Sequence, residues 1–196
     1  MFYRYNNIKN CSNSRQGCNH RVKKNNYSND MYYNDYQEDK YVIGAYVSGG
    51  PLAPNINGMI LFEPDMEGTI VSATFYNLPE YEPASNDQGP IGPFGFHLHE
   101  HGSCNIGNIA SPFEDAGGHW NPDNQPHGNH AGDFPVVFSN NGYSQQSFFT
   151  NKFRPEDVIG KAVIIHQNPD DYRTQPSGNS GKRLACGVIG YISLKG

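Results

Sequence analysis

The chain has 196 residues, of which 36% are hydrophobic, and its formal net charge is −5. A chain of this length can bury one substantial core, so one domain with a terminal extension is the simplest organisation. Residues 1–40 carry seven Lys and Arg against four Asp and Glu, whereas residues 41–196 carry seven against fifteen. An acidic body excludes a nucleic-acid footprint, and the lack of a long apolar run argues against a signal peptide, export or a membrane span.

The first forty residues contain nine Asn and six Tyr but almost no aliphatic side chains. Such a segment cannot bury enough apolar surface to offset the entropy lost on ordering, so we interpret 1–40 as a disordered tail. Its Tyr- and Asn-rich repeats leave open an assembly or cross-linking role with a partner. Cys11 and Cys18, with His20 nearby, leave open a further metal site, although their spacing fits no firm metal motif.

From residue 41 to residue 196 the sequence is typical of an all-β domain. Apolar and β-branched runs recur between clusters of Gly, Pro, Asn and Asp, and no segment keeps a helical period. The expected strands are 41–47, 58–63, 69–78, 94–100, 134–139, 144–151, 161–167 and 186–194. Their number predicts a sandwich or barrel of about eight strands. Phe75, Phe94, Phe96 and Phe138 are expected to pack in the core or at the barrel ends.

Two long stretches, 102–133 and 167–182, lack strand character, and loops of this length in a compact domain are usually functional. Six of the eight histidines lie between residues 97 and 130. Neutral imidazole suits zinc and copper. The clustering therefore predicts a bound transition metal, and more than one ion.

The run GFHLHE (95–100) places His97 and His99 on one face of a strand, because side chains alternate along it. Their ring nitrogens can converge on one ion, and His166, at the end of the run KAVIIH, can reach the same ion. His101 extends the alternation and stays open as a competing ligand, although we expect Gly102 to end the strand.

A second set of ligand types follows on the first long loop. GGHWNP carries His119, and PHGNHAGD adds His127, His130 and Asp133. Three nitrogens and one carboxylate oxygen form the closed four-ligand set that structural zinc prefers.

These motifs together resemble those of the copper/zinc superoxide dismutase family. The matching runs, in the family's order, are GFHLHEHGSC, SPFEDAGGHWNP, HGNHAGD, VIIHQNPDD and GNSGKRLACGVIG. Together they place most of residues 41–196. The resemblance implies a Greek-key β-barrel of eight strands with two long functional loops.

The resemblance also implies two ligand sets. The residues that resemble the copper ligands are His97, His99, His119 and His166, and those that resemble the zinc ligands are His119, His127, His130 and Asp133. His119 would then bridge the two metals with both ring nitrogens, which requires metal charge close by.

Four further residues take roles from the resemblance. Asp170 matches an aspartate that joins the copper and zinc ligands through hydrogen bonds. Arg183 matches the arginine that holds the superoxide anion beside copper, a task suited to a fixed guanidinium. Cys104 and Cys186 match the family's disulfide within the domain.

The implied activity is the dismutation of superoxide to dioxygen and hydrogen peroxide. Copper would change redox state, His119 would carry a proton, and zinc would hold the loop in place, as a d10 ion must. The segment between His127 and His130 is shorter than is usual in the family, so the zinc loop must turn more tightly.

Alternatives from other classes stay open. One is a non-catalytic copper- and zinc-binding module on the same barrel, and another is a coat-type structural protein in which the tail does the work. A copper-only protein is disfavoured because HGNHAGD supplies a full zinc set. A homodimer is compatible with the sequence. We expect the cytoplasm as the compartment, with a surface or coat location as the alternative, although a disulfide ordinarily suits an oxidising space.

Overall fold

The computed structural model describes residues 41–85 and 89–193, and it has eight strands there. The predicted tail, with Cys11, Cys18 and His20, lies outside the described residues. The strands are β1 (Tyr41–Gly49), β2 (Asn57–Pro64), β3 (Thr69–Tyr76), β4 (Phe96–His99), β5 (Ser144–Thr150), β6 (Ala162–His166), β7 (Arg183–Val188) and β8 (Gly190–Ser193). Within these ranges the only helices are two short 3-10 turns, η1 (Glu114–Ala116) and η2 (Pro155–Val158). The all-β prediction is confirmed.

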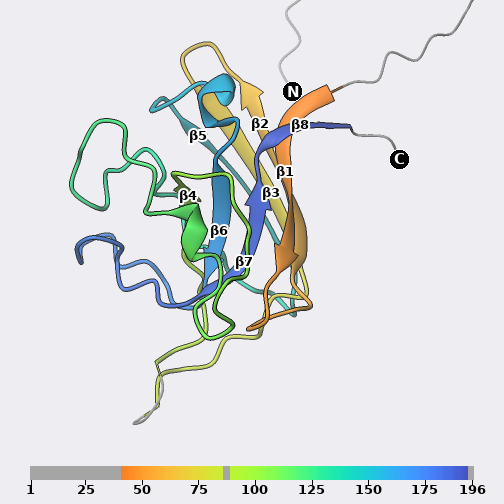
Figure 1. Cartoon of the computed structure of the whole chain (residues 1–196), viewed down its shortest axis with the longest axis vertical. Coiled ribbons are helices and arrows are strands. Elements are labelled where there is room, and N and C mark those ends of the chain that lie inside the picture. The colour runs from red at the N-terminus through yellow and green to blue at the C-terminus, as the bar shows by residue number, and fades with distance from the viewer. Residues whose placement is uncertain (1–40, 86–88, 194–196) are drawn as a thin grey trace, which may run out of the picture. The chain divides into compact units, whose positions relative to one another are not determined.

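The strands form one curled antiparallel sheet in the order β4-β6-β7-β1-β2-β3-β5, with β8 paired to β1 (Figure 1). Some neighbours in the sheet are distant in the sequence: β7 lies beside β1, and β5 lies beside β3. This arrangement is the predicted Greek-key β-barrel. The connections from β4 to β5 and from β6 to β7 extend to the same side of the barrel in Figure 1.

The segment that follows Asp133 lies between β4 and β5, the two outer strands of the order. Val137 forms a bridge with Phe94, and the ring of Phe134 lies 5.0 Å from those of Phe96 and Phe148. Phe134 thus fills the gap between β4 and β5 with buried apolar surface.

The prediction of a strand at 134–139 was wrong. Pro135 has no N–H to donate to a ladder, and the N–H of Val136 donates to the hydroxyl of Tyr172 instead of to a neighbouring strand. Only the bridge at Val137 remains. Phe138 is 59% exposed, so its assignment to the core or barrel end was also wrong.

The run 186–194 was expected as one strand, but its described part, up to residue 193, belongs to two. β7 begins at Arg183 and pairs with β6 and β1, whereas β8 pairs with the start of β1. The chain changes partner at Ile189, whose backbone exchanges hydrogen bonds with Gly160 and Lys161. A single residue, Ile189, therefore separates two strands that the apolar pattern alone could not divide.

β4 positions the site. Phe96 and Leu98 belong to the main core, and the intervening His97 and His99 are also buried, on the other face of the strand. β4 pairs with β6, whose last residue is His166. Among the described residues, no helix has the length and apolar character needed to cross a membrane.

Candidate metal centre

The predicted ligand residues gather into two clusters that share His119. In each cluster the candidate ligand atoms all lie within 4.8 Å of one another. Cluster 1 consists of His97, His99, His119 and His166, and cluster 2 consists of His119, His127, His130 and Asp133. The structure thus brings together both sets that the sequence indicated.

Cluster 1 is held by the pairing of β4 with β6. A register shift at Ile165 and His166 turns the end of β6, and the Nε2 atoms of His99 and His166 lie 3.2 Å apart. His119 joins from the first long loop through a bridge to His99. All four imidazoles are buried, at 8% exposure or less.

Cluster 2 is arranged around the carboxylate of Asp133. Its Oδ1 accepts a hydrogen bond from Nδ1 of His119 at 3.0 Å and lies 3.3 and 3.2 Å from Nδ1 of His127 and His130. Its Oδ2 accepts the backbone N–H groups of Gly128 and His130 at 2.8 and 3.0 Å. Three ring nitrogens and one carboxylate oxygen therefore lie close enough together to bind a single cation.

In the part of the chain that the structure describes, four buried ring nitrogens have no hydrogen-bond partner: His97 Nδ1, His119 Nε2, His127 Nδ1 and His130 Nδ1. Buried polar atoms are normally paired, so atoms of this kind need another partner. Two of them belong to each cluster, and a metal ion in each would satisfy them. The donor types fit: four imidazoles suit copper, and three imidazoles with one carboxylate suit zinc.

Asp170, in the second long loop, connects the clusters. Its Oδ2 accepts from Nε2 of His97 at 2.7 Å, and its Oδ1 accepts from Nε2 of His127 at 2.8 Å. Because each outer nitrogen donates to the carboxylate, each Nδ1 is left with its lone pair directed into a cluster. This contact supports the role that the sequence suggested for Asp170.

Burial sets the protonation of the clusters. It lowers the pKa of His97 to about 4, against the opposing hydrogen bond to Asp170. Burial and neighbouring histidines lower the pKa values of His99 and His166 well below the usual range. Burial opposes ionisation of Asp133, but its hydrogen bond from His119 and the nearby His127 and His130 bring its pKa below the ordinary value. Neutral imidazoles and an ionised carboxylate are the forms that bind metal.

Arg183 begins β7 and is about half buried. Its guanidinium donates to the carbonyl oxygens of Phe113 and Gly117, the latter at 2.7 Å. It lines a hollow of about 250 Å³ together with His99, His119, His166, Gly118, Pro176, Ser177 and Gly181. A small anion in this hollow would meet the guanidinium and cluster 1 at once.

The predicted disulfide between Cys104 and Cys186 is confirmed. It ties the start of the first long loop to β7, the strand that carries Arg183. His101 is exposed and belongs to neither cluster of the described residues. The strand ends at His99, before the alternation reaches His101.

Several residues at the site were not predicted from the sequence. Gly117 accepts hydrogen bonds through its carbonyl oxygen, and Pro176 and Ser177 line the hollow. Gln175 contacts the backbone of His127, and Tyr172 contacts that of Phe134, just after Asp133. Whether a backbone carbonyl accepts such a hydrogen bond, or a loop residue makes such a contact, depends on the tertiary structure. Residue type and spacing therefore do not predict it.

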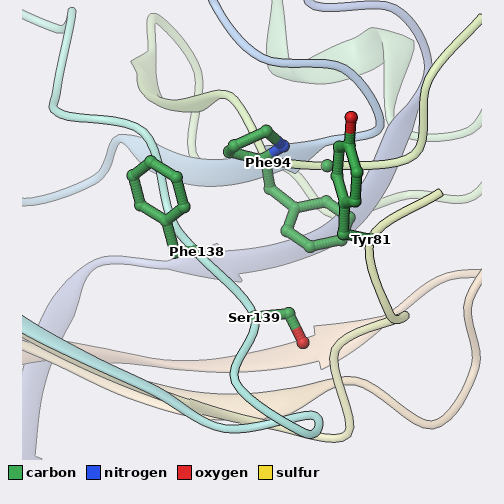
Figure 2. Close-up of a pocket in the computed structure, with 6 residues that line it drawn as sticks. Tyr81, Phe94, Phe138 and Ser139 are labelled. Carbon is green, nitrogen blue, oxygen red and sulfur yellow. The ribbon is translucent and has the colours of Figure 1, made fainter. Parts of the chain in front are cut away.

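A second hollow, of about 270 Å³, lies at a different place and has an apolar lining that includes Pro93 and Gly92. Figure 2 places the ring of Phe94 between those of Phe138 and Tyr81, with Ser139 beside them. None of these residues belongs to either cluster. The hollow lined by Arg183 is also lined by three histidines of cluster 1 and so fits redox chemistry at a metal.

The fold and the two histidine clusters are those of a β-barrel protein with ligand sets for two metal ions. The model of the copper/zinc superoxide dismutase family matches residues 56–189. The Cu-Zn superoxide dismutase of Deinococcus radiodurans is 35% identical over 155 residues, which cover 70% of this chain and 79% of that protein. That of Legionella pneumophila is 35% identical over 140 residues, or 67% and 76% of the two chains.

Solved structures agree. The Cu/Zn superoxide dismutase from Brucella abortus matches with a TM-score of 0.60 and 25% identity, over 75% of this chain and 98% of that one. The chain belongs to the copper/zinc superoxide dismutase family.

Proposed function

We propose that this protein dismutates superoxide, converting two superoxide anions and two protons into dioxygen and hydrogen peroxide. The observation that carries the proposal is the position of His119, which belongs to both clusters: its Nδ1 contacts Asp133 in cluster 2, and its Nε2 is buried without a hydrogen-bond partner. One imidazole between two sets of ligand atoms is the arrangement that a bridged pair of cations needs.

Copper is the proposed ion for cluster 1 and zinc for cluster 2. When bound, copper supplies the redox change by alternating between its two oxidation states as one superoxide is oxidised and the next is reduced. Cluster 2 offers a closed set of four ligands, which is typical of structural zinc. Its task is then to hold His119 and the loop in place.

The residues of the chain supply binding and proton transfer. Arg183 offers a permanently charged group beside cluster 1, and its contacts with Phe113 and Gly117 fix the guanidinium in one orientation. His119, which cluster 1 shares with cluster 2, has a buried Nε2 without a hydrogen-bond partner. That nitrogen is placed to accept a proton and return it to reduced oxygen.

The test is superoxide decay by pulse radiolysis on protein loaded with both metals, with bound metal counted on the same sample. We expect fast decay at one copper per chain. The His119→Gln variant should show no fast superoxide decay and should retain only one of the two metal ions. His101→Gln is the matched control, because His101 is an exposed histidine outside both clusters, and it should leave the decay unchanged. Full copper occupancy without decay would refute the proposal and favour a non-catalytic metal-binding or coat-type role.

A further inference from the structure

The segment that follows Asp170 contacts His127, at the start of the loop between His127 and Asp133, and Phe134 and Val136 just after that loop. Tyr172 and Gln175 provide these contacts through their side chains and backbone. They come from the second long loop, whereas the contacted residues belong to the first and to its exit. The two loops are therefore fastened to each other beside cluster 2.

The hydroxyl of Tyr172 is inserted into the backbone just after Asp133. It donates to the carbonyl oxygen of Phe134 at 3.0 Å and accepts the N–H of Val136 at 2.9 Å. The backbone N–H of Tyr172 donates to Oδ1 of Asp170 at 2.7 Å. Tyr172 thus joins the carboxylate that contacts His127 to the chain that leaves Asp133.

The side-chain amide of Gln175 pairs with both backbone polar groups of His127. Its Oε1 accepts the N–H of His127 at 2.8 Å, and its Nε2 donates to the carbonyl oxygen of His127 at 3.3 Å. The same Nε2 donates to the carbonyl oxygen of Arg173 at 3.2 Å, which orients the amide. The backbone on both sides of the His127 Cα is thereby fixed.

Gly128 allows this close approach. Its φ is +92°, and a Cβ atom there would lie 2.3 Å from the carbonyl oxygen of Tyr172. The two backbones touch at this point, and only a glycine fits both the dihedral angle and the space.

The loop between His127 and His130 is short. The N–H of Asn129 donates to Pro126, and Lys152 donates to Asn129 and to the carbonyl oxygen of His130 from outside the loop. The N–H groups of Gly128 and His130 donate to Asp133, which is itself a member of cluster 2. Much of the loop's internal bonding therefore relies on the group that would bind the ion. Anchors from outside the loop can hold its geometry independently.

We propose that Tyr172 and Gln175 are positioning residues for cluster 2. They hold His127 and the chain around Asp133 in the arrangement that retains zinc, and they take over the support that a longer loop would provide. The inference rests on the proposed assignment of zinc to this cluster. It concerns metal retention, so it can be tested without measuring dismutation.

The experiment uses the full chain loaded with copper and zinc, as wild type, Tyr172→Phe, Gln175→Ala and the double variant. Tyr143→Phe is the matched control. The hydroxyl of Tyr143 donates to Gln145 and its ring packs on Tyr76, away from the loop between His127 and Asp133. Release of each metal to a colorimetric chelator is followed separately. Thermal unfolding of the metal-free proteins is measured in parallel.

Loss of groups that orient metal ligands typically weakens binding about 10- to 100-fold, and we expect zinc release to quicken by about tenfold or more in the double variant. Each single change removes only one of the two anchors, so it should have a smaller effect. Copper release, metal-free unfolding and the Tyr143→Phe control should stay within about twofold of wild type, a margin small beside the tenfold effect expected for zinc.

Zinc release within twofold of wild type in the double variant would overturn the inference. Equal acceleration of both metals with a lower unfolding temperature would also overturn it, in favour of plain destabilisation. A wild-type protein that takes up no zinc would instead refute the two-metal assignment, which is a separate result.

Discussion

Arg183 and His99 share one hydrogen-bond acceptor, the carbonyl oxygen of Gly117. Nη2 of Arg183 donates to it at 2.7 Å and Nδ1 of His99 at 2.9 Å. Because a carbonyl oxygen only accepts, Nδ1 of His99 carries the proton and Nε2 presents its lone pair to cluster 1. A single backbone atom therefore fixes both the ligand form of His99 and the direction of the guanidinium.

Arg183→Lys should lower the rate of superoxide decay while copper remains bound. Lysine keeps the charge but lacks the planar fork that reaches both Phe113 and Gly117, so the cation is no longer held in place. Loss of one such contact is worth about 1 kcal/mol, which corresponds to a rate roughly five- to tenfold lower, and Arg183→Met should fall further.

The measurement is pulse radiolysis on samples matched for copper content. A lysine variant with the wild-type rate would show that charge alone suffices at this position. A variant that loses copper would show that Arg183 acts mainly through His99 and Gly117.

Asp170→Asn should weaken the binding of at least one of the two metals. The carboxylate accepts from His97 and His127 through its two oxygens, whereas an amide has only one oxygen to offer. One imidazole would then lose the partner that orients it, and we expect an affinity about 10- to 100-fold lower for at least one ion. Competition with a chelator for copper and for zinc measures this effect. Asp65→Asn is the control, because Asp65 is exposed in the turn between β2 and β3, where its carboxylate accepts the N–H of Met66.

Much of the site could be predicted because its ligand types are chemically distinctive. The alternation of His97 and His99 follows from strand geometry, and the set on the first loop follows from the ligands that zinc prefers. Both inferences need only local spacing. The all-β class follows similarly from the punctuation of apolar runs by turn residues.

What could not be predicted depends on partners that are remote in the sequence. The run 134–139 looks like a strand, but Pro135 and the contact of Val136 with Tyr172 prevent a ladder. The division between β7 and β8 depends on which neighbour each half meets. The contacts of Gln175 with His127 depend on how two loops approach each other. Residue spacing carries no record of that approach.

Removing the disulfide should destabilise the protein and loosen Arg183. Cys104 and Cys186 are separated by 82 residues, and closing so long a loop contributes about 4 kcal/mol in the chain-entropy model. The bridge also anchors the loop that supplies the carbonyl oxygens of Phe113 and Gly117. Denaturant unfolding of Cys104→Ser/Cys186→Ser should show a lower midpoint. An unchanged midpoint would mean that packing of β7 alone holds the loop.

The metal-free protein should lose stability as the pH falls from about 6.5 to 4. Burial lowers the pKa of His97 from 6.5 to about 4, and burial with neighbouring charges lowers the pKa values of His99 and His166 well below 6.5. In this range the unfolded chain binds protons that the folded chain excludes. Stability therefore falls with pH, since its slope follows the difference in bound protons. For His97 alone the loss at pH 4 is about 3 kcal/mol.

The carboxylates contribute over a lower range. Their hydrogen bonds with histidines leave the pKa values of Asp133 and Asp170 below the usual 3.8, so the stability they give is present above pH 3.8 and lost below it. Urea unfolding in the presence of a chelator at pH 7, 5.5 and 4.5 tests the histidine range. His97→Gln should flatten the slope, because glutamine does not titrate. Equal stability of the wild-type apoprotein at pH 7 and 4.5 would contradict the burial of neutral histidines in cluster 1.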